Sequence, residues 1–234
     1  MIIKINKKLK IGSPLKPLLI AEISANHAGS KKSFLKHIVN AKQSGADMVK
    51  IQTYEAEDMI IDKKFKISKG LWKNKKLWQL YEEAKTPFDW HHDAFKIAKK
   101  NNIELFSTPF SLRSLNFLKQ FKPNIYKIAS FEITDLNLIS EIAKTKKPII
   151  LSTGLATENE IKNAVSVIKK YHKKIILMYC VSSYPASNSE IDFRKIERLK
   201  KITKINNIGF SDHTLGLVAP TLSLAHGVCA IEKH

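Results

Sequence analysis

The chain has few cysteines and no long apolar run, and each shortage excludes a class of protein. It contains 2 cysteines in 234 residues, too few for a disulfide framework. Cys180 and Cys229 both lie in apolar segments, which predicts reduced core residues of a cytoplasmic protein. No apolar run approaches the roughly 18 residues that span a bilayer, so we expect no membrane partner. The basic N-terminus lacks the apolar stretch and the cleavage site of a signal peptide.

Arginine is also scarce, although the formal net charge is +19. Strongly basic proteins often bind nucleic acid, but such sites favour arginine for its bidentate contacts. Arg113, Arg194 and Arg198 are the only arginines, and the lysines are scattered along the chain. We therefore expect no nucleic-acid partner and interpret the charge as a general lysine bias, part of which helps to collect an anionic substrate. A basic binding protein is the alternative.

Short segments rich in Ile, Val and Leu alternate with helical patterns along the chain. Such segments are typical of parallel strands that are covered on both faces. The expected strands are 18–24, 48–53, 104–110, 125–130, 148–153, 175–180, 207–213 and 228–234. The expected helices are 33–44, 88–100, 112–121, 135–146, 157–171, 193–201 and 219–226, with one more near 75–84 in a long insertion, 54–86.

This alternation predicts one α/β domain over residues 1–234, with a parallel sheet and right-handed crossovers. Eight expected strands favour a closed (β/α)8 barrel of the TIM type. An open doubly wound sheet is the alternative, but no GxGxxG loop follows the first expected strand.

Polar and ionisable residues gather at the carboxyl ends of the expected strands, where a barrel carries its active site. A purely structural strand would stay apolar there, so the pattern as a whole predicts an enzyme site. In chain order these residues are Glu22, Ser24, Asn26 and His27; Lys50 and Gln52; Ser107 and Thr108; Lys127, Ser130 and Glu132; Ser152 and Thr153; Ser182 and Tyr184; Ser211, Asp212 and His213; and Glu232 and His234.

Lys50 and Lys127 each interrupt an apolar strand. A lone strand lysine usually extends to solvent, but two in one barrel among hydroxyl groups predict a cradle for phosphate and carboxylate groups. A Schiff-base lysine is the alternative. It requires one lysine isolated in an apolar pocket, which fits less well.

His213 and His234 end consecutive expected strands, so their imidazoles should lie close enough to share a metal ion. A single such histidine is more often an ordinary hydrogen-bonded residue. Glu232 precedes His234 by two residues and therefore faces the same side of the strand. There it would ligate the metal, orient a metal-bound water or act as a base.

Glu22 and Glu132 are the remaining carboxylates expected at the mouth of the barrel. Either is a candidate general base. The alternative is that each forms a structural ion pair with Lys50 or Lys127.

In their order, the strand ends resemble those of the sialic acid synthase family. The matching segments are AEISANH (21–27), GADMVKIQ (45–52), FSTPF (106–110), YKIAS (126–130), LSTG (151–154), SSYP (182–185), SDH (211–213) and IEKH (231–234). Each motif alone is weak, but the ordered set is specific and covers the chain from about residue 15 onward. Phe131 and the insertion segment 70–87 are similar to the pseudaminic acid branch of this family.

The resemblance implies that phosphoenolpyruvate condenses with an open-chain N-acetylated amino sugar and releases phosphate. It also implies that a divalent ion, Mn²⁺ or Mg²⁺, is held by His213 and His234 and polarises the sugar aldehyde. The expected phosphoenolpyruvate ligands are Lys50, Thr108, Lys127, Ser130, Ser152 and Ser211, with Tyr184, Gln52 and Ser182 completing the substrate site. The candidate catalytic residues are Glu22, Glu132 and Glu232.

Three alternatives to a pseudaminic acid synthase remain at this stage. One is a sialic or legionaminic acid synthase of the same family. Another is an aldol synthase for a phosphorylated sugar, which predicts more arginines at the mouth. The third is an inactive truncated remnant, because family members add a last barrel helix and an antifreeze-like domain that completes the site in a homodimer. The sequence ends at His234, so the resemblance predicts a barrel without both parts and makes the dimer doubtful.

Overall fold

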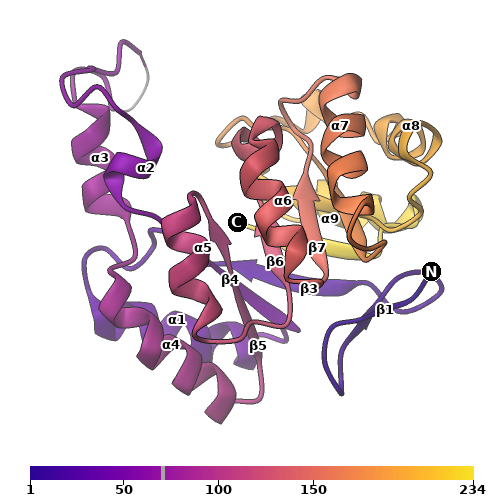
Figure 1. The fold of residues 1–234 in the computed structure, drawn as a ribbon, viewed down its shortest axis with the longest axis horizontal. Coiled ribbons are helices and arrows are strands. Elements are labelled where there is room, and N and C mark those ends of the chain that lie inside the picture. The colour runs from indigo at the N-terminus through magenta and orange to yellow at the C-terminus, as the bar shows by residue number, and fades with distance from the viewer. Residues whose placement is uncertain (70–71) are drawn as a thin grey trace.

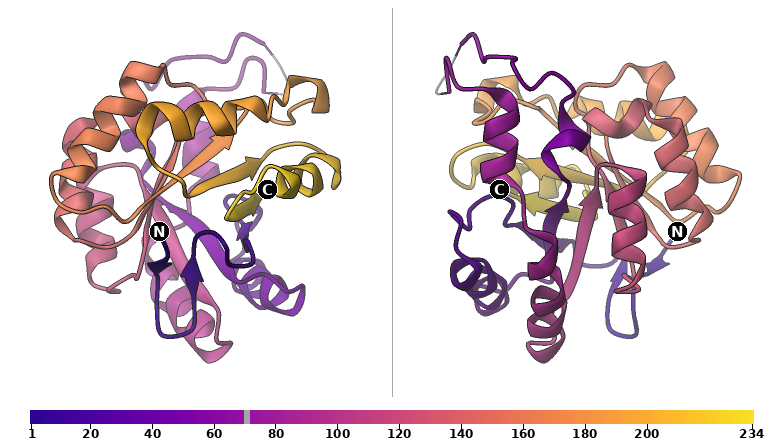
Figure 2. Two further views of the ribbon diagram at one scale, coloured as in Figure 1. Left: turned by 90° about the vertical axis from the view of Figure 1, so that its right-hand side faces the viewer. Right: turned by 60° about the vertical axis from the view of Figure 1, so that its left-hand side comes forward.

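The computed structural model describes residues 1–69 and 72–234, and a parallel barrel dominates them (Figures 1 and 2). Its strands are β3 (Leu18–Glu22), β4 (Met48–Thr53), β5 (Glu104–Pro109), β6 (Tyr126–Ile128), β7 (Ile149–Ser152), β8 (Ile175–Cys180), β9 (Ile208–Asp212) and β10 (Ala230–Lys233). In the described residues they form one sheet in the order β5-β4-β3-β10-β9-β8-β7-β6. The first barrel strand therefore pairs with the last, in parallel, which confirms the predicted TIM-type barrel.

The barrel has a seam between β5 and β6, the two ends of the hydrogen-bonded order. These strands pack side by side, but no ladder joins them in the part of the chain that the structure describes. Side chains bridge the seam near its amino end, where Asn124 Nδ2 donates to Glu104 at 3.1 Å.

Helices cover the outside of the sheet, as the left view of Figure 2 shows. They are α1 (Lys31–Gln43), α4 (Phe88–Lys100), α5 (Leu112–Lys119), α6 (Leu136–Lys144), α7 (Glu158–Lys169), α8 (Arg194–Thr203) and α9 (Val218–Ala225). Helix α7 begins with the expected capping box, in which Thr157 and Glu160 satisfy each other's backbone N–H groups. After α1, Gly45 turns the chain with a φ of 90°, a conformation that glycine adopts at little cost.

An N-terminal hairpin, β1 (Ile3–Lys4) and β2 (Lys10–Ile11), was not predicted from the sequence. Its apolar side chains close the amino end of the barrel, where Ile3 and Ile11 are buried in one core cluster with Met48 and Phe106. The hairpin therefore forms the floor opposite the expected active site.

The insertion after β4 differs from its prediction. It holds α2 (Ala56–Met59) and α3 (Leu77–Ala84), where one helix near 75–84 was expected. A helix of four residues is too short to show a period. Figure 1 shows both helices standing apart from the ring of barrel helices. Residues 70 and 71, which belong to the segment similar to the pseudaminic branch, lie outside the described residues. No helix in the described residues is long and apolar enough to cross a membrane.

Candidate active site

A cavity of about 50 Å³ lies at the carboxyl ends of the strands. It brings together all the expected substrate-binding residues, both expected metal ligands and one of the three candidate catalytic glutamates. These residues are Lys50, Gln52, Thr108, Lys127, Ser130, Ser152, Ser182, Tyr184, Ser211, His213, His234 and Glu232. The strand ends thus converge on one site, although they are up to 184 positions apart in the sequence.

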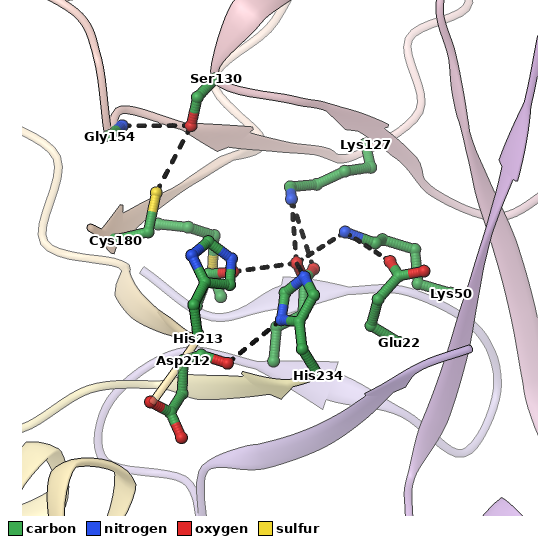
Figure 3. Close-up of polar contacts among 12 residues, drawn as sticks. Glu22, Lys50, Lys127, Ser130, Gly154, Cys180, Asp212, His213 and His234 are labelled. Carbon is green, nitrogen blue, oxygen red and sulfur yellow. Dashed lines mark hydrogen bonds and ion pairs between the residues drawn. The ribbon is translucent and has the colours of Figure 1, made fainter. Parts of the chain in front are cut away.

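Lys50 and Lys127 extend their ammonium groups toward one another (Figure 3), and the fully buried Glu232 lies between them. Its Oε1 atom lies 2.6 Å from Lys50 Nζ and 3.2 Å from Lys127 Nζ. Ser211 Oγ donates a further hydrogen bond to the same oxygen at 3.0 Å. Burial alone would raise the pKa of Glu232, but Lys127 and Lys50 outweigh it and lower the pKa, so the carboxylate is ionised.

Lys50 is shared between two carboxylates. Besides Glu232, it contacts Glu22 Oε2 at 2.7 Å. The other Glu22 oxygen accepts a hydrogen bond from the backbone N–H of Ser24 at 2.7 Å. Burial lowers the pKa of Lys50, and the attraction of Glu232 opposes that shift. Glu22 does not line the cavity. Its contact with Lys50 is the structural ion pair that was expected as the alternative to a role as general base.

His213 and His234 lie on the neighbouring strand ends of β9 and β10, with ring centroids 4.2 Å apart. His213 Nδ1 contacts the Val181 carbonyl at 2.5 Å, and His234 Nδ1 contacts the Asp212 carbonyl at 3.1 Å. A carbonyl only accepts, so each Nδ1 carries the proton and each Nε2 keeps its lone pair. Burial lowers both pKa values, that of His234 to about 3. Both rings are therefore neutral imidazoles, the form that binds metals.

The donor set fits a divalent metal ion. Glu22, Glu232 and His234 each offer one ligand atom, and these atoms all lie within 4.8 Å of one another. Glu232 Oε1 is 3.9 Å from His234 Nε2. The carbonyl that fixes each imidazole is the support that metal-bound histidines usually have. His213 presents its Nε2 atom to the Tyr184 hydroxyl at 3.1 Å, and the two rings stack at 4.1 Å.

Ser130, Gly154 and Cys180 meet in the wall formed by β6, β7 and β8 (Figure 3). The backbone N–H of Gly154 donates to Ser130 Oγ at 3.2 Å, and this hydroxyl lies 3.4 Å from Cys180 Sγ. A Cβ atom at Gly154 would lie 2.7 Å from that sulfur. Only glycine therefore fits at this position without displacing the wall of the cavity.

Glu132 is the second residue of a short 3-10 helix, η1 (Phe131–Thr134), which follows Ser130. It does not line the cavity, and in the described residues it makes no ion pair with Lys127. Its Oε2 atom is buried without a hydrogen-bond partner. Burial raises the pKa of Glu132 to about 7.

Sequence reasoning missed four residues of the wall, namely Phe110, Ala129, Phe131 and Cys180. All lie at or just after strand ends, but a search for polar groups passes over them. The alternation of side chains along each strand could have identified them, because every second residue faces the inside of the barrel.

Ser107 was expected at the mouth but faces away from it. It lies in a buried chain of hydrogen bonds outside the barrel wall, with Thr53 Oγ1 2.6 Å from Ser107 Oγ and 2.7 Å from His91 Nε2. Burial lowers the pKa of His91 to about 4. This chain ties α4 to β4 and β5 directly behind Gln52 and Thr108.

Comparisons with known proteins show which family the chain resembles. The NeuB family model matches residues 37–234. The chain is 44% identical to the pseudaminic acid synthase of Campylobacter jejuni strain 81-176 over 94% of its own length. It is 38% identical to an N,N'-diacetyllegionaminic acid synthase of Campylobacter jejuni over the same share. The sialic acid synthetase structure from Leptospira borgpetersenii superposes with a TM-score of 0.89 and 34% identity, covering 100% of this chain and 78% of that one.

A heptulosonate-phosphate synthase from Thermotoga maritima superposes with a TM-score of 0.72 at 15% identity, which shows a shared fold alone. The chain spans 65% of the length of the Campylobacter pseudaminic acid synthase. The match to the family model, which covers most of the sequence, and the ordered strand-end residues lead to one conclusion: this chain belongs to the NeuB family.

Proposed function

We propose that the chain forms the catalytic barrel of a nonulosonic acid synthase, which condenses phosphoenolpyruvate with an open-chain N-acetylated amino sugar. The observation that supports this best is the convergence of two buried lysines, a row of hydroxyl groups and two neutral histidines on one cavity. Pseudaminic acid is the proposed product, since the similarity to pseudaminic acid synthases exceeds that to the legionaminic acid synthases.

In this proposal Lys50 and Lys127 hold the anionic groups of phosphoenolpyruvate. Ammonium groups and hydroxyl donors together suit phosphate and carboxylate oxygens. The hydroxyls come from Thr108, Ser130, Ser152 and Ser211, while Gln52, Ser182 and Tyr184 contact the sugar.

His213 and His234 would hold the metal, with the clustered carboxylates of Glu232 and Glu22 as further oxygen ligands. The metal would supply Lewis-acid polarisation of the sugar aldehyde when it is bound. Two imidazoles favour Mn²⁺ over Mg²⁺, because Mg²⁺ prefers oxygen ligands. The neighbouring carbonyls of Val181 and Asp212 keep both Nε2 atoms available for it.

The reaction balances with one water. C3 of phosphoenolpyruvate bonds to the aldehyde carbon, whose oxygen gains a proton, and C2 becomes electron-deficient. Water adds to C2 and loses a proton, and phosphate leaves with cleavage of its C–O bond.

Phosphate release from phosphoenolpyruvate tests this function. The assay compares candidate amino sugars, with and without Mn²⁺, for the wild type and Lys127→Met. The proposal expects release that requires the sugar, the metal and Lys127. Release with a mannosamine-type sugar alone would assign the chain to the sialic acid branch. No release with any sugar would support an inactive remnant.

A further inference from the structure

Lys50 and Lys127 already hold an anion that belongs to the chain itself. Glu232 reaches both ammonium groups, at 2.6 and 3.2 Å, and its side chain is 0% exposed. The hydroxyl of Ser211 completes the clamp at 3.0 Å. Three groups expected to bind phosphoenolpyruvate are therefore engaged by one carboxylate.

The charges of this cluster cancel. Two ammonium groups face two carboxylates, since Glu22 also lies 2.7 Å from Lys50. A phosphoenolpyruvate anion that enters this neutral cluster must displace Glu232 from the lysines. The displaced carboxylate would then be a buried charge without a partner, which is strongly unfavourable.

His234 stands next to Glu232 on the other side. The distance from Glu232 Oε1 to His234 Nε2 is 3.9 Å. Ligand atoms bound at about 2.1 Å to one divalent ion lie roughly 3.0 to 4.2 Å apart, depending on the angle between them. A metal ion therefore fits between these two atoms with little movement, and it offers the carboxylate a partner other than the lysines.

We propose that Glu232 is an internal anion that competes with phosphoenolpyruvate for Lys50 and Lys127, and that a divalent ion relieves this competition by taking over the carboxylate. The inference rests on the proposed function, because it assumes that phosphoenolpyruvate binds to these lysines. Metal and phosphoenolpyruvate then bind with positive coupling, and each tightens the other by the same factor.

Calorimetric titration of the whole chain with phosphoenolpyruvate tests this competition, with and without saturating Mn²⁺. The wild type should bind phosphoenolpyruvate at least about tenfold more tightly with Mn²⁺, a coupling typical of linked sites. Glu232→Gln should bind phosphoenolpyruvate without metal as tightly as the metal-loaded wild type does. If Glu232 were a metal ligand and nothing more, Glu232→Gln would bind phosphoenolpyruvate without metal only as tightly as the metal-free wild type does. Glu132→Gln, which neutralises another buried carboxyl outside the cavity, serves as the matched control and should keep the wild-type coupling.

A second measurement needs no variant. The Kd for Mn²⁺, obtained from free Mn²⁺ by electron paramagnetic resonance, should fall when phosphoenolpyruvate is added to the wild type, by the same factor as the Kd for phosphoenolpyruvate falls with Mn²⁺ in the calorimetry. Equal phosphoenolpyruvate affinity with and without Mn²⁺ overturns the inference and leaves the proposed function standing. Undiminished coupling in Glu232→Gln also overturns it, because the metal would then contact phosphoenolpyruvate directly. Absence of phosphoenolpyruvate binding in every arm overturns the proposed function and the inference together.

Discussion

The carboxyl of Glu132 should make the fold less stable as the pH rises, and Glu132→Gln should remove this effect. Burial raises the pKa of this group from 4.5 to about 7. Between these values the folded chain holds a proton that the unfolded chain has released, so the free energy of unfolding falls as the pH rises from 4.5 to 7. At about 1.4 kcal/mol for each pH unit, the loss approaches roughly 3 kcal/mol above pH 7.

Urea unfolding followed by circular dichroism at pH 5 and pH 8 measures this loss. Glu132→Gln should unfold at higher urea than the wild type at pH 8, with a gain of about 2 to 3 kcal/mol, and the gain should shrink at pH 5. Glu83→Gln is the control, because the Glu83 side chain is 51% exposed. An equal gain at both pH values would refute the reasoning, since the benefit would then come from packing and not from the buried charge.

Three further predictions concern the support of the site. His91→Phe should lower the free energy of unfolding at pH 7 by about 1 to 3 kcal/mol, because Thr53 loses its buried acceptor. Adding Thr53→Val to the same chain should restore most of this free energy. If urea unfolding showed that the two losses add, the hydrogen bond between the two side chains would not be the cause. Ile11→Ala should cost about 2 to 5 kcal/mol in the same assay, because Ile11 is fully buried in the barrel floor; a loss below about 1 kcal/mol would mean that the hairpin does not close the barrel. Gly154→Ala should weaken phosphoenolpyruvate binding in calorimetry, since the new Cβ would lie 2.7 Å from Cys180 Sγ; unchanged affinity would show that the wall yields.

The barrel could be predicted because its strands repeat one physical pattern. Segments such as β8 (Ile175–Cys180) are buried on both faces, so they are apolar throughout and stand out from the helices. The hairpin strands β1 and β2 have two residues each. A strand of two residues has no period, and its place under the barrel depends on contacts with distant strands.

The sequence allowed us to predict which residues gather at the cavity, but not which carboxylate contacts which lysine. Residues at strand ends of a barrel must converge, which brought Lys50, Lys127 and Glu232 together on topology alone. Which carboxylate each lysine contacts depends on strand register. Because β10 pairs with β3 beside β4, Glu232 reaches Lys50, while Glu132 turns into the short helix after β6 and lies outside the cavity. Sequence spacing carries no information about either outcome.

Eight of the lysines behind the net charge of +19 share a position in the fold that composition alone did not reveal. Lysines occupy the last turns of six barrel helices in the described chain; they are Lys42, Lys99, Lys100, Lys119, Lys144, Lys169, Lys200 and Lys201. Positive charge at a helix carboxyl end is favoured by the helix dipole. Barrel helices run antiparallel to the strands, so these lysines gather at the end opposite the cavity, where the two buried lysines are balanced by two glutamates. These eight lysines therefore stabilise helix ends, far from the cavity, where the two buried lysines are so closely balanced that a metal ion would change the charge most.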